Sequence, residues 1–176
     1  KQLHVVASTA VSSGGEGLAA FRYAQALSSV SCMVTLLSRG MSSKAAAILS
    51  SNGMFEQQFT APRNFLFNIF FEYRFIWHLC ERKQFNLIHL HGLWSPMLAI
   101  AALIAYRRNI PLIISPHGCL EPWALRNKYY KKLLAMKMYQ GAVLRSASLF
   151  VATADQEFQS IRNLGWQQPI AVVPNG

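Results

Sequence analysis

The sequence has few acidic residues and little charge overall. Only 7 of its 176 residues are Asp or Glu, against 17 Lys or Arg, so a hydrolase that depends on paired carboxylates is hard to assemble from it. It contains neither a Gly-x-Ser-x-Gly nor a His-Glu-x-x-His segment, which argues against a serine-hydrolase elbow and a zinc-protease helix. The formal net charge of +10 favours anionic partners without choosing between nucleic acid, anionic lipid headgroups and phosphorylated small molecules.

Cysteines are also few, and no apolar run is long. Cys32, Cys80 and Cys119 lie far apart, a spacing that offers neither a zinc site nor a disulfide framework and fits a reducing compartment. The segment Leu3–Ala7 is too short for the core of a secretory signal. The longest uncharged apolar run, Met97–Tyr106, is about half of what a bilayer span requires. We expect a cytoplasmic protein that can rest on the inner face of the cell membrane without crossing it.

Short apolar segments alternate with longer segments of helical periodicity. The predicted strands are Leu3–Ala7, Met33–Leu37, Leu87–Leu90, Leu112–Ser115, Leu149–Ala152 and Ile170–Val173. The predicted helices are Glu16–Ser29, Ser43–Ser51, Asn64–Arg82, Pro96–Arg108, Lys128–Arg145 and Asp155–Leu164. This alternation predicts one α/β domain with a Rossmann-like, doubly wound, mostly parallel sheet. Because the sequence stops on the turn signal Pro174–Gly176, we expect the protein to continue beyond it.

A glycine-rich segment follows the first predicted strand and opens the first helix. Gly14, Gly15 and Gly17 would let the backbone approach a ligand closely, and the amino terminus of the helix would attract an anion. Glu16 would offset part of that attraction. A tight strand-to-helix turn explains the glycines equally well.

Two of the predicted strands end in a His-Gly pair, His91–Gly92 and His117–Gly118. Ligands of open α/β sheets bind at the carboxyl ends of the strands, and an imidazole beside backbone amides suits a polyhydroxyl ligand or an oxyanion. His89 and His91 share one side of an extended segment. With no carboxylate or cysteine nearby in sequence, we expect no metal site, and His89 fits an ordinary core histidine.

These segments together resemble glycosyltransferase family 4, whose members are retaining enzymes of the GT-B fold. The similarity is greatest to members that build bacterial surface polysaccharides, and Asn86 departs from the family by standing where an aspartate is usual. The resemblance is carried by Leu87–Trp94, Pro116–Gly118, Pro122–Leu125, Lys131–Lys132, Ala152–Glu157 and Val173–Gly176.

The resemblance implies that residues 1–176 are the amino-terminal, acceptor-side domain of such an enzyme, and that the carboxyl-terminal donor-binding domain is absent from this chain. The substrates would be a nucleotide-sugar donor and a glycan or lipid-linked acceptor, with no metal and no cofactor. His117 would be the catalytic residue, in contact with the donor sugar or its developing charge. The tryptophans could stack on a sugar or belong to the core. The residues expected to bind donor or acceptor are Gly14, Gly15, Gly17, His91, Gly92, Trp94, Gly118 and Trp123.

Basic residues gather on and just before one predicted helix, which indicates either a solvated helix face or a face that rests on an anionic membrane. Each Lys or Arg near such a surface contributes about 1 kcal/mol. The residues concerned are Arg126, Lys128, Lys131, Lys132 and Lys137.

Two rival functions remain beside sugar transfer. One is a GT-B nucleotide-sugar epimerase, and the other is a basic α/β module that binds nucleic acid. The aromatic residues of Phe65–Trp77 lie on an apolar helix rather than between basic residues on a strand platform, so we expect no nucleic-acid partner. Because a GT-B active site lies between two domains, we also expect this chain to fold alone but not to catalyse.

Overall fold

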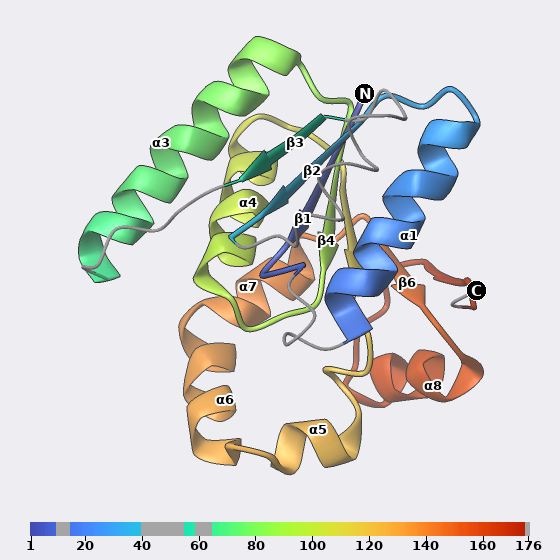
Figure 1. Ribbon diagram of the computed structural model, residues 1–176. Helices are drawn as coiled ribbons and strands as arrows, with labels where there is room; N and C mark the ends of the chain where they lie inside the picture. The colour runs from blue at the N-terminus through green and yellow to red at the C-terminus, as the bar shows by residue number, and fades with distance from the viewer. Residues whose placement is uncertain (10–14, 40–54, 59–64, 175–176) are drawn as a thin grey trace.

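The computed structural model describes residues 1–9, 15–39, 55–58 and 65–174. Its centre is a sheet of seven parallel strands in the order β3-β2-β1-β4-β5-β6-β7 (Figure 1). The order confirms the predicted Rossmann-like, doubly wound sheet, with its topological switch between β1 and β4. The strands are β1 (Gln2–Val6), β2 (Val34–Ser38), β3 (Phe55–Gln58), β4 (Leu87–His91), β5 (Leu112–Ser115), β6 (Leu149–Ala152) and β7 (Ile170–Val172).

Helices cover both faces of this sheet (Figure 1). On one face α1 packs against β1, β2 and β4, and α8 packs against β6 and β7. On the other face α4 packs against β1, β4 and β5, with α3 outside it and α7 beside it. The helices are α1 (Gly15–Ser29), α3 (Phe65–Lys83), α4 (Pro96–Arg107), α5 (Pro122–Arg126), α6 (Tyr129–Ala135), α7 (Gly141–Arg145) and α8 (Asp155–Asn163).

The alternation of side chains along β1 divides the core between the two faces. Leu3 and Val5 belong to a large apolar cluster together with residues of α4. Val6 points the other way and joins a smaller cluster with Ala20 and Ala24 of α1. His4 also lies on the α1 face, where a histidine takes the place of an apolar core residue.

The helix predicted over Lys128–Arg145 is divided by a π-helical turn, Met136–Gln140, that joins α6 to α7. The amide of Gly141 donates to the carbonyl of Met136, five residues back, and a Cβ at position 141 would lie 2.8 Å from that oxygen. Glycine therefore permits the wider turn. Lys128 stands before α6 in a left-handed conformation, with φ 54°.

Two further elements differ from the sequence prediction. The strand β3 was not predicted, because Glu56, Gln57 and Gln58 give it no apolar run. The short helix α5 begins at Pro122, whose fixed φ suits a first helical position, and it was not predicted either. The helix predicted over Ser43–Ser51 lies outside the described residues.

Candidate functional site

The candidate site lies where β1, β4 and β5 end, beside the topological switch of the sheet. The last residue of β4 is His91, and His117 follows two residues after the end of β5. The amino terminus of α1 begins at Gly15 on the same side of the sheet. Crevices at the carboxyl ends of strands next to a switch point are where open α/β sheets bind ligands.

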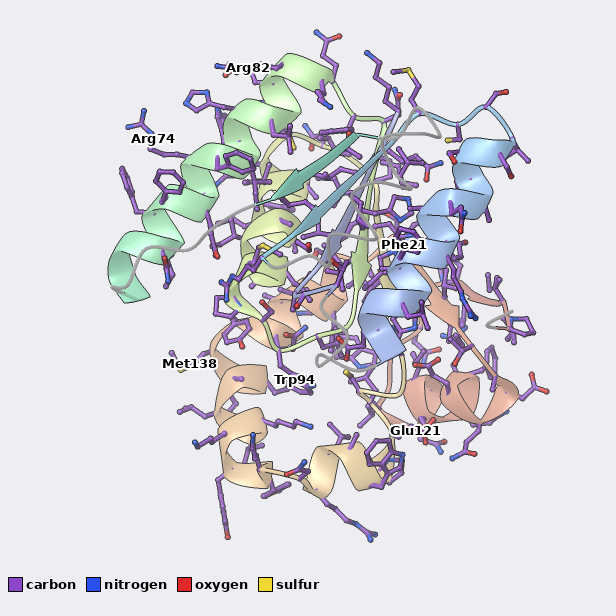
Figure 2. All side chains as sticks on the ribbon, viewed as in Figure 1. Phe21, Arg74, Arg82, Trp94, Glu121 and Met138 are labelled. Carbon is purple, nitrogen blue, oxygen red and sulfur yellow. The ribbon has the colours of Figure 1, made fainter. Side chains whose placement is uncertain are left out.

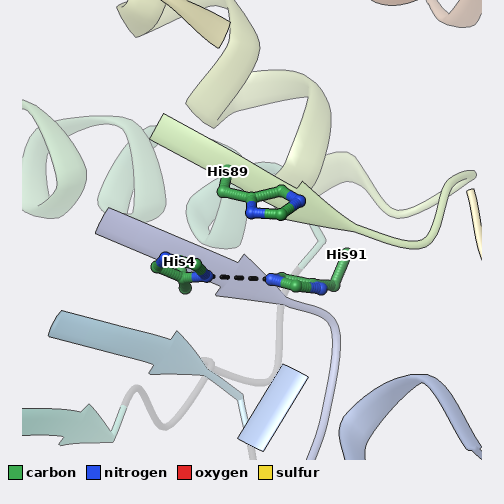
Figure 3. Close-up of side chains that lie close together, drawn as sticks. All are labelled: His4, His89 and His91. Atoms are coloured by element: carbon green, nitrogen blue, oxygen red, sulfur yellow. Dashed lines mark hydrogen bonds between the residues drawn. The ribbon is translucent and has the colours of Figure 1, made fainter. Parts of the chain in front are cut away.

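Three buried histidines, His4, His89 and His91, lie together on the α1 face of the sheet next to this edge (Figure 3). His4 and His89 are register partners on adjacent strands, and Tyr23 of α1 packs against them with its ring 5.2 Å from that of His89. Burial lowers the pKa of His4 to about 4 and holds the pKa values of His89 and His91 well below the ordinary value. The three buried imidazoles are therefore uncharged near neutral pH.

The ring nitrogens of these histidines lie within 4.8 Å of one another, which makes them the one group in the described part of the chain whose spacing could hold a metal ion. Other contacts oppose that use. Both ring nitrogens of His4 and of His91 already take part in side-chain hydrogen bonds. The rings of His89 and His91 are stacked, with centroids 4.2 Å apart, and Nε2 of His89 lies 2.7 Å from the hydroxyl oxygen of Ser115. The arrangement favours a hydrogen-bonded cluster over a metal centre.

His117 is joined to this cluster at the edge of the site. Its Nε2 lies 3.1 Å from Nδ1 of His91, and the two rings are stacked. Burial lowers the pKa of His117, while the carboxylate of Glu157 acts in the opposite direction. Its Nδ1 is screened from solvent and has no hydrogen-bond partner among the described residues. The half-buried His117 thus carries an uncharged imidazole whose Nδ1 is left unpaired by the described residues.

The backbone that carries His117 is held in an unusual conformation. His117 and Gly118 both have positive φ, 51° and 77°, a region that costs a non-glycine residue about 1–2 kcal/mol. Glu157 of α8 stabilises the turn, since its carboxylate accepts the amide of Gly118 at 2.6 Å. The same carboxylate accepts hydrogen bonds from the amide and the hydroxyl of Thr153, at 2.7 and 2.9 Å.

The backbone amides of both His-Gly pairs have hydrogen-bond acceptors within the protein. The amide of Gly118 donates to Glu157, and the amide of Gly92 donates to the carbonyl of Ser115 at 2.8 Å. Neither amide is left to receive an oxyanion. His91 is fully buried in this chain, and its Nδ1 faces His117.

The expected glycines of the strand-to-helix segment have different surroundings. A Cβ at Gly17 would lie 2.5 Å from the carbonyl oxygen of Ser8, so this glycine lets α1 pack onto the segment after β1. A Cβ at Gly15 would meet nothing within 4 Å. Gly15 is exposed at the first position of α1, where a ligand has room. Gly14 lies outside the described residues.

Glu16 is directed into the protein rather than toward an anion site. A Cβ at Gly92 would collide with its carboxylate, and the thiol of Cys119 donates to its Oε1 at 3.1 Å. Burial raises the pKa of Glu16. The acidic residue of the glycine segment therefore ties α1 to the ends of β4 and β5.

The two tryptophans expected near a sugar lie in different environments. Trp123 is 68% exposed, and its ring would contact a Cβ placed on Gly118 at 4.0 Å, so it stands at the edge of the site. Trp94, labelled in Figure 2, is half-buried and packs against the core. The ammonium of Lys132 lies 5.3 Å from the centre of the Trp94 ring.

The basic residues of the expected membrane face do not all share one environment. Arg126, Lys128, Lys131 and Lys137 are exposed. Lys132 is half-buried, and its ammonium donates to the carbonyl of Ala124 at 2.6 Å, so it connects α6 to α5. Within the described ranges, no helix combines the length and the hydropathy that a membrane crossing requires.

Three residues of the site were not assigned a role from the sequence. His4 is an isolated histidine in an apolar segment, and only its register with His89 brings it into the cluster. Glu157 lies 39 residues away in sequence from Gly118, whose amide donates a hydrogen bond to its carboxylate. Glu16 was expected only to weaken anion binding at the amino terminus of the first helix, whereas its carboxylate packs against Gly92.

Comparisons with known proteins agree with this architecture. The model of glycosyltransferase family 4 matches residues 13–176, and no curated protein sequence matches significantly. A glycosyltransferase from Rickettsia africae is similar in structure, with 14% identity, a TM-score of 0.64 and coverage of 99% of this chain and 43% of that one. The UDP-GlcNAc 2-epimerase from Neisseria meningitidis bound to UDP-GlcNAc gives 10% identity, a TM-score of 0.67 and coverage of 98% and 45%.

A further similar structure is the Anabaena protein HepE in complex with UDP and glucose, with 16% identity, a TM-score of 0.67 and coverage of 100% of this chain and 44% of that one. At such identities the likeness concerns the fold, and the chain spans less than half the length of each of these structures. The family model covers nearly the whole chain. The chain therefore belongs to glycosyltransferase family 4.

Proposed function

We propose that this chain is the acceptor-side domain of a retaining glycosyltransferase, which transfers a sugar from a nucleotide-sugar donor to a glycan or lipid-linked acceptor during surface-polysaccharide synthesis. The observation that carries the proposal is the placement of His117 at the carboxyl end of β5, one hydrogen bond from the buried end of β4. Family membership supports the reaction class, and the UDP-sugar or UDP bound to several proteins of similar fold supports a nucleotide-sugar donor.

In this proposal His117 meets the donor sugar in the cleft between two domains. An uncharged imidazole suits that role, since it can pair with a sugar hydroxyl and can also face positive charge that develops at the anomeric carbon. The exposed ring of Trp123 beside Gly118 gives a surface on which an acceptor sugar can stack. Gly15 leaves room for the diphosphate at the amino terminus of α1.

The test is a substitution of His117 in the full-length protein. His117→Ala should lower kcat by about a hundredfold or more, the range seen when one preorganised contact to a transition state is lost, while the melting temperature changes little. His78→Ala is the matched control, because that histidine is exposed on α3, far from the site. If His117→Ala keeps its activity within about twofold, which corresponds to about 0.4 kcal/mol, the proposed role is wrong.

Epimerisation of a nucleotide sugar is the second candidate, because several structures of similar fold are UDP-GlcNAc 2-epimerases. Product analysis separates the two reactions. A transferase needs an acceptor and yields a glycosylated product, whereas an epimerase interconverts free nucleotide sugars with no acceptor present. We expect turnover only with an acceptor, and epimerised nucleotide sugar in its absence would refute the transferase.

We further propose that the protein rests on the cytoplasmic face of an anionic membrane through α5 and α6, which project beyond the carboxyl ends of the strands (Figure 1). Three free cysteines support a reducing compartment. The four exposed basic residues of this region sum to about 4 kcal/mol at an anionic surface. Exposed apolar side chains accompany them: Tyr129, Tyr130, Leu134 and Met138.

Sedimentation with vesicles tests this placement. The chain should bind vesicles that contain anionic lipid and leave neutral vesicles in the supernatant, and changing Lys128, Lys131 and Lys137 together to Gln should abolish the binding. The control changes Arg74 and Arg82 to Gln. Both arginines are exposed on α3 and lie far from Trp94 (Figure 2). Equal binding to both kinds of vesicle, or to neither, would rule out an electrostatic membrane contact.

A further inference from the structure

Three imidazoles form a continuous hydrogen-bonded chain that begins inside the sheet and ends at the candidate site. Nε2 of His4 lies 3.1 Å from Oε1 of Gln2. Nδ1 of His4 lies 2.9 Å from Nε2 of His91, the contact drawn in Figure 3. Nδ1 of His91 lies 3.1 Å from Nε2 of His117. His89 stands beside this chain and bonds Ser115 instead, at 2.7 Å. We refer to Gln2, His4, His91 and His117 as the imidazole chain.

The first residue of the imidazole chain determines where each proton lies. In the structure Oε1 of the Gln2 carboxamide faces His4, and because an amide oxygen only accepts hydrogen bonds, this orientation places the hydrogen of His4 on Nε2. In a neutral ring the other nitrogen is then bare. Nδ1 of His4 therefore accepts, and His91 must carry its hydrogen on Nε2. By the same reasoning Nδ1 of His91 is bare and accepts from Nε2 of His117.

The last nitrogen of the imidazole chain, Nδ1 of His117, therefore carries no hydrogen. That atom is also the one for which the described residues offer no hydrogen-bond partner. The neutral state on which the argument depends is the one that burial favours, because it lowers the pKa of His4, His91 and His117 alike. With this order of donors, the unpaired Nδ1 of His117 is an acceptor.

We propose that Gln2, His4 and His91 are positioning residues that hold His117 in the tautomer with its hydrogen on Nε2, so that its bare Nδ1 accepts a hydrogen bond from a hydroxyl of the bound sugar. This inference rests on the proposed sugar-transfer function. A bare nitrogen pairs with a hydroxyl and repels the oxygens of a carboxylate or a phosphate. The imidazole chain thus selects a neutral sugar hydroxyl at the place that faces His117.

The imidazole chain orients His117 and does not conduct protons. Passing a proton along it would end at Gln2, whose carboxamide has no place for a proton at neutral pH. On the α1 face the side chain that packs on His4 is Tyr23, which has no carboxylate, and the carboxylate of Glu16 packs on Gly92 and accepts from the thiol of Cys119. Glu157 of α8 faces His117 at the opposite end and does not reach His4.

Two substitutions of His4 in the full-length protein separate positioning from packing. His4→Phe keeps an aromatic ring and removes the acceptor for His91, while His4→Gln supplies a carboxamide oxygen that can take its place. His89→Phe is the matched control, since His89 is as deeply buried on the same face but lies outside the imidazole chain. If His4→Phe does not fold, Gln2→Met and Gln2→Glu make the same comparison at a half-buried residue.

The tautomer is read directly from long-range proton–nitrogen spectra of protein labelled with ¹⁵N-histidine. We expect His117 to carry its hydrogen on Nε2 in the unchanged protein, in His4→Gln and in His89→Phe, and to populate both tautomers in His4→Phe. Sugar-transfer kcat/KM should fall about tenfold in His4→Phe (about 1.4 kcal/mol) and stay within about twofold in His4→Gln and His89→Phe. The two Phe variants should lose similar melting temperature, so stability cannot explain a difference in activity.

Several results would overturn the inference. They are a hydrogen on Nδ1 of His117 in the unchanged protein, a His4→Phe variant with unaltered tautomer and rate, and stoichiometric zinc in the purified protein whose removal abolishes activity. Because the spectra need no substrate, the inference and the proposed function fail separately. The expected tautomer without any sugar transfer would refute the function, whereas sugar transfer with the other tautomer would refute the positioning role.

Discussion

Removing the carboxylate of Glu157 should both destabilise the domain and disable the site. Glu157→Ala leaves the amides of Gly118 and Thr153 without their acceptor, and each unsatisfied buried donor costs about 1–3 kcal/mol. The sum is about 2–6 kcal/mol. Because Gly118 and Thr153 are half-buried, water can accept hydrogen bonds from part of these freed amides. We therefore expect the free energy of unfolding to fall by about 2–4 kcal/mol.

The same substitution should release the turn that carries His117, so the activity of the full-length protein should fall more steeply than stability alone explains. Urea unfolding of the 176-residue chain and initial rates measured well below its melting temperature separate the two effects. Gln159→Ala, exposed on the same helix, is the control and should stay within about 0.5 kcal/mol. A loss below about 1 kcal/mol for Glu157→Ala would show that its two amide contacts are replaceable, and the reasoning would be wrong.

Three further predictions concern the fold and the chain as a whole. A Cβ at Gly17 would lie 2.5 Å from a backbone oxygen, so Gly17→Ala should lower the free energy of unfolding by about 1–3 kcal/mol, whereas Gly15→Ala should not lower it in the same urea titration. The three buried imidazoles, packed against Tyr23, have lowered pKa values, so the unfolded chain binds more protons and stability should fall with decreasing pH. For His4, whose pKa is lowered from 6.5 to about 4, the loss over that interval is roughly 3 kcal/mol, and His4→Phe should flatten the stability–pH curve. Finally, the chain alone should melt cooperatively yet transfer no sugar. It should bind nucleotides only with a Kd of about 1 mM (roughly 4 kcal/mol). Micromolar nucleotide binding by calorimetry would contradict the assignment to the acceptor side.

The sequence alone determined the architecture, and it indicated the strand ends at which the candidate site lies. Runs such as residues 112–114, apolar on both faces, indicate parallel strands between helices, because only a strand covered on both sides favours apolar residues at successive positions. His117 and Gly118 were recognisable because they lie just beyond the end of such a strand. Local composition failed at β3, whose residues Phe55–Gln58 are mostly polar although they pair with β2.

Tertiary structure alone decided which groups meet at that site. His4 and His91 are 87 residues apart in the chain, and a shift of one residue in the register of β1 against β4 would turn His4 to the other face of the sheet. The engagement of Gly118 by Glu157 likewise depends on how α8 packs beside β6. Sequence patterns report periodicity within a segment, whereas hydrogen-bond partners follow from register and packing between segments, which the pattern of a single segment does not contain.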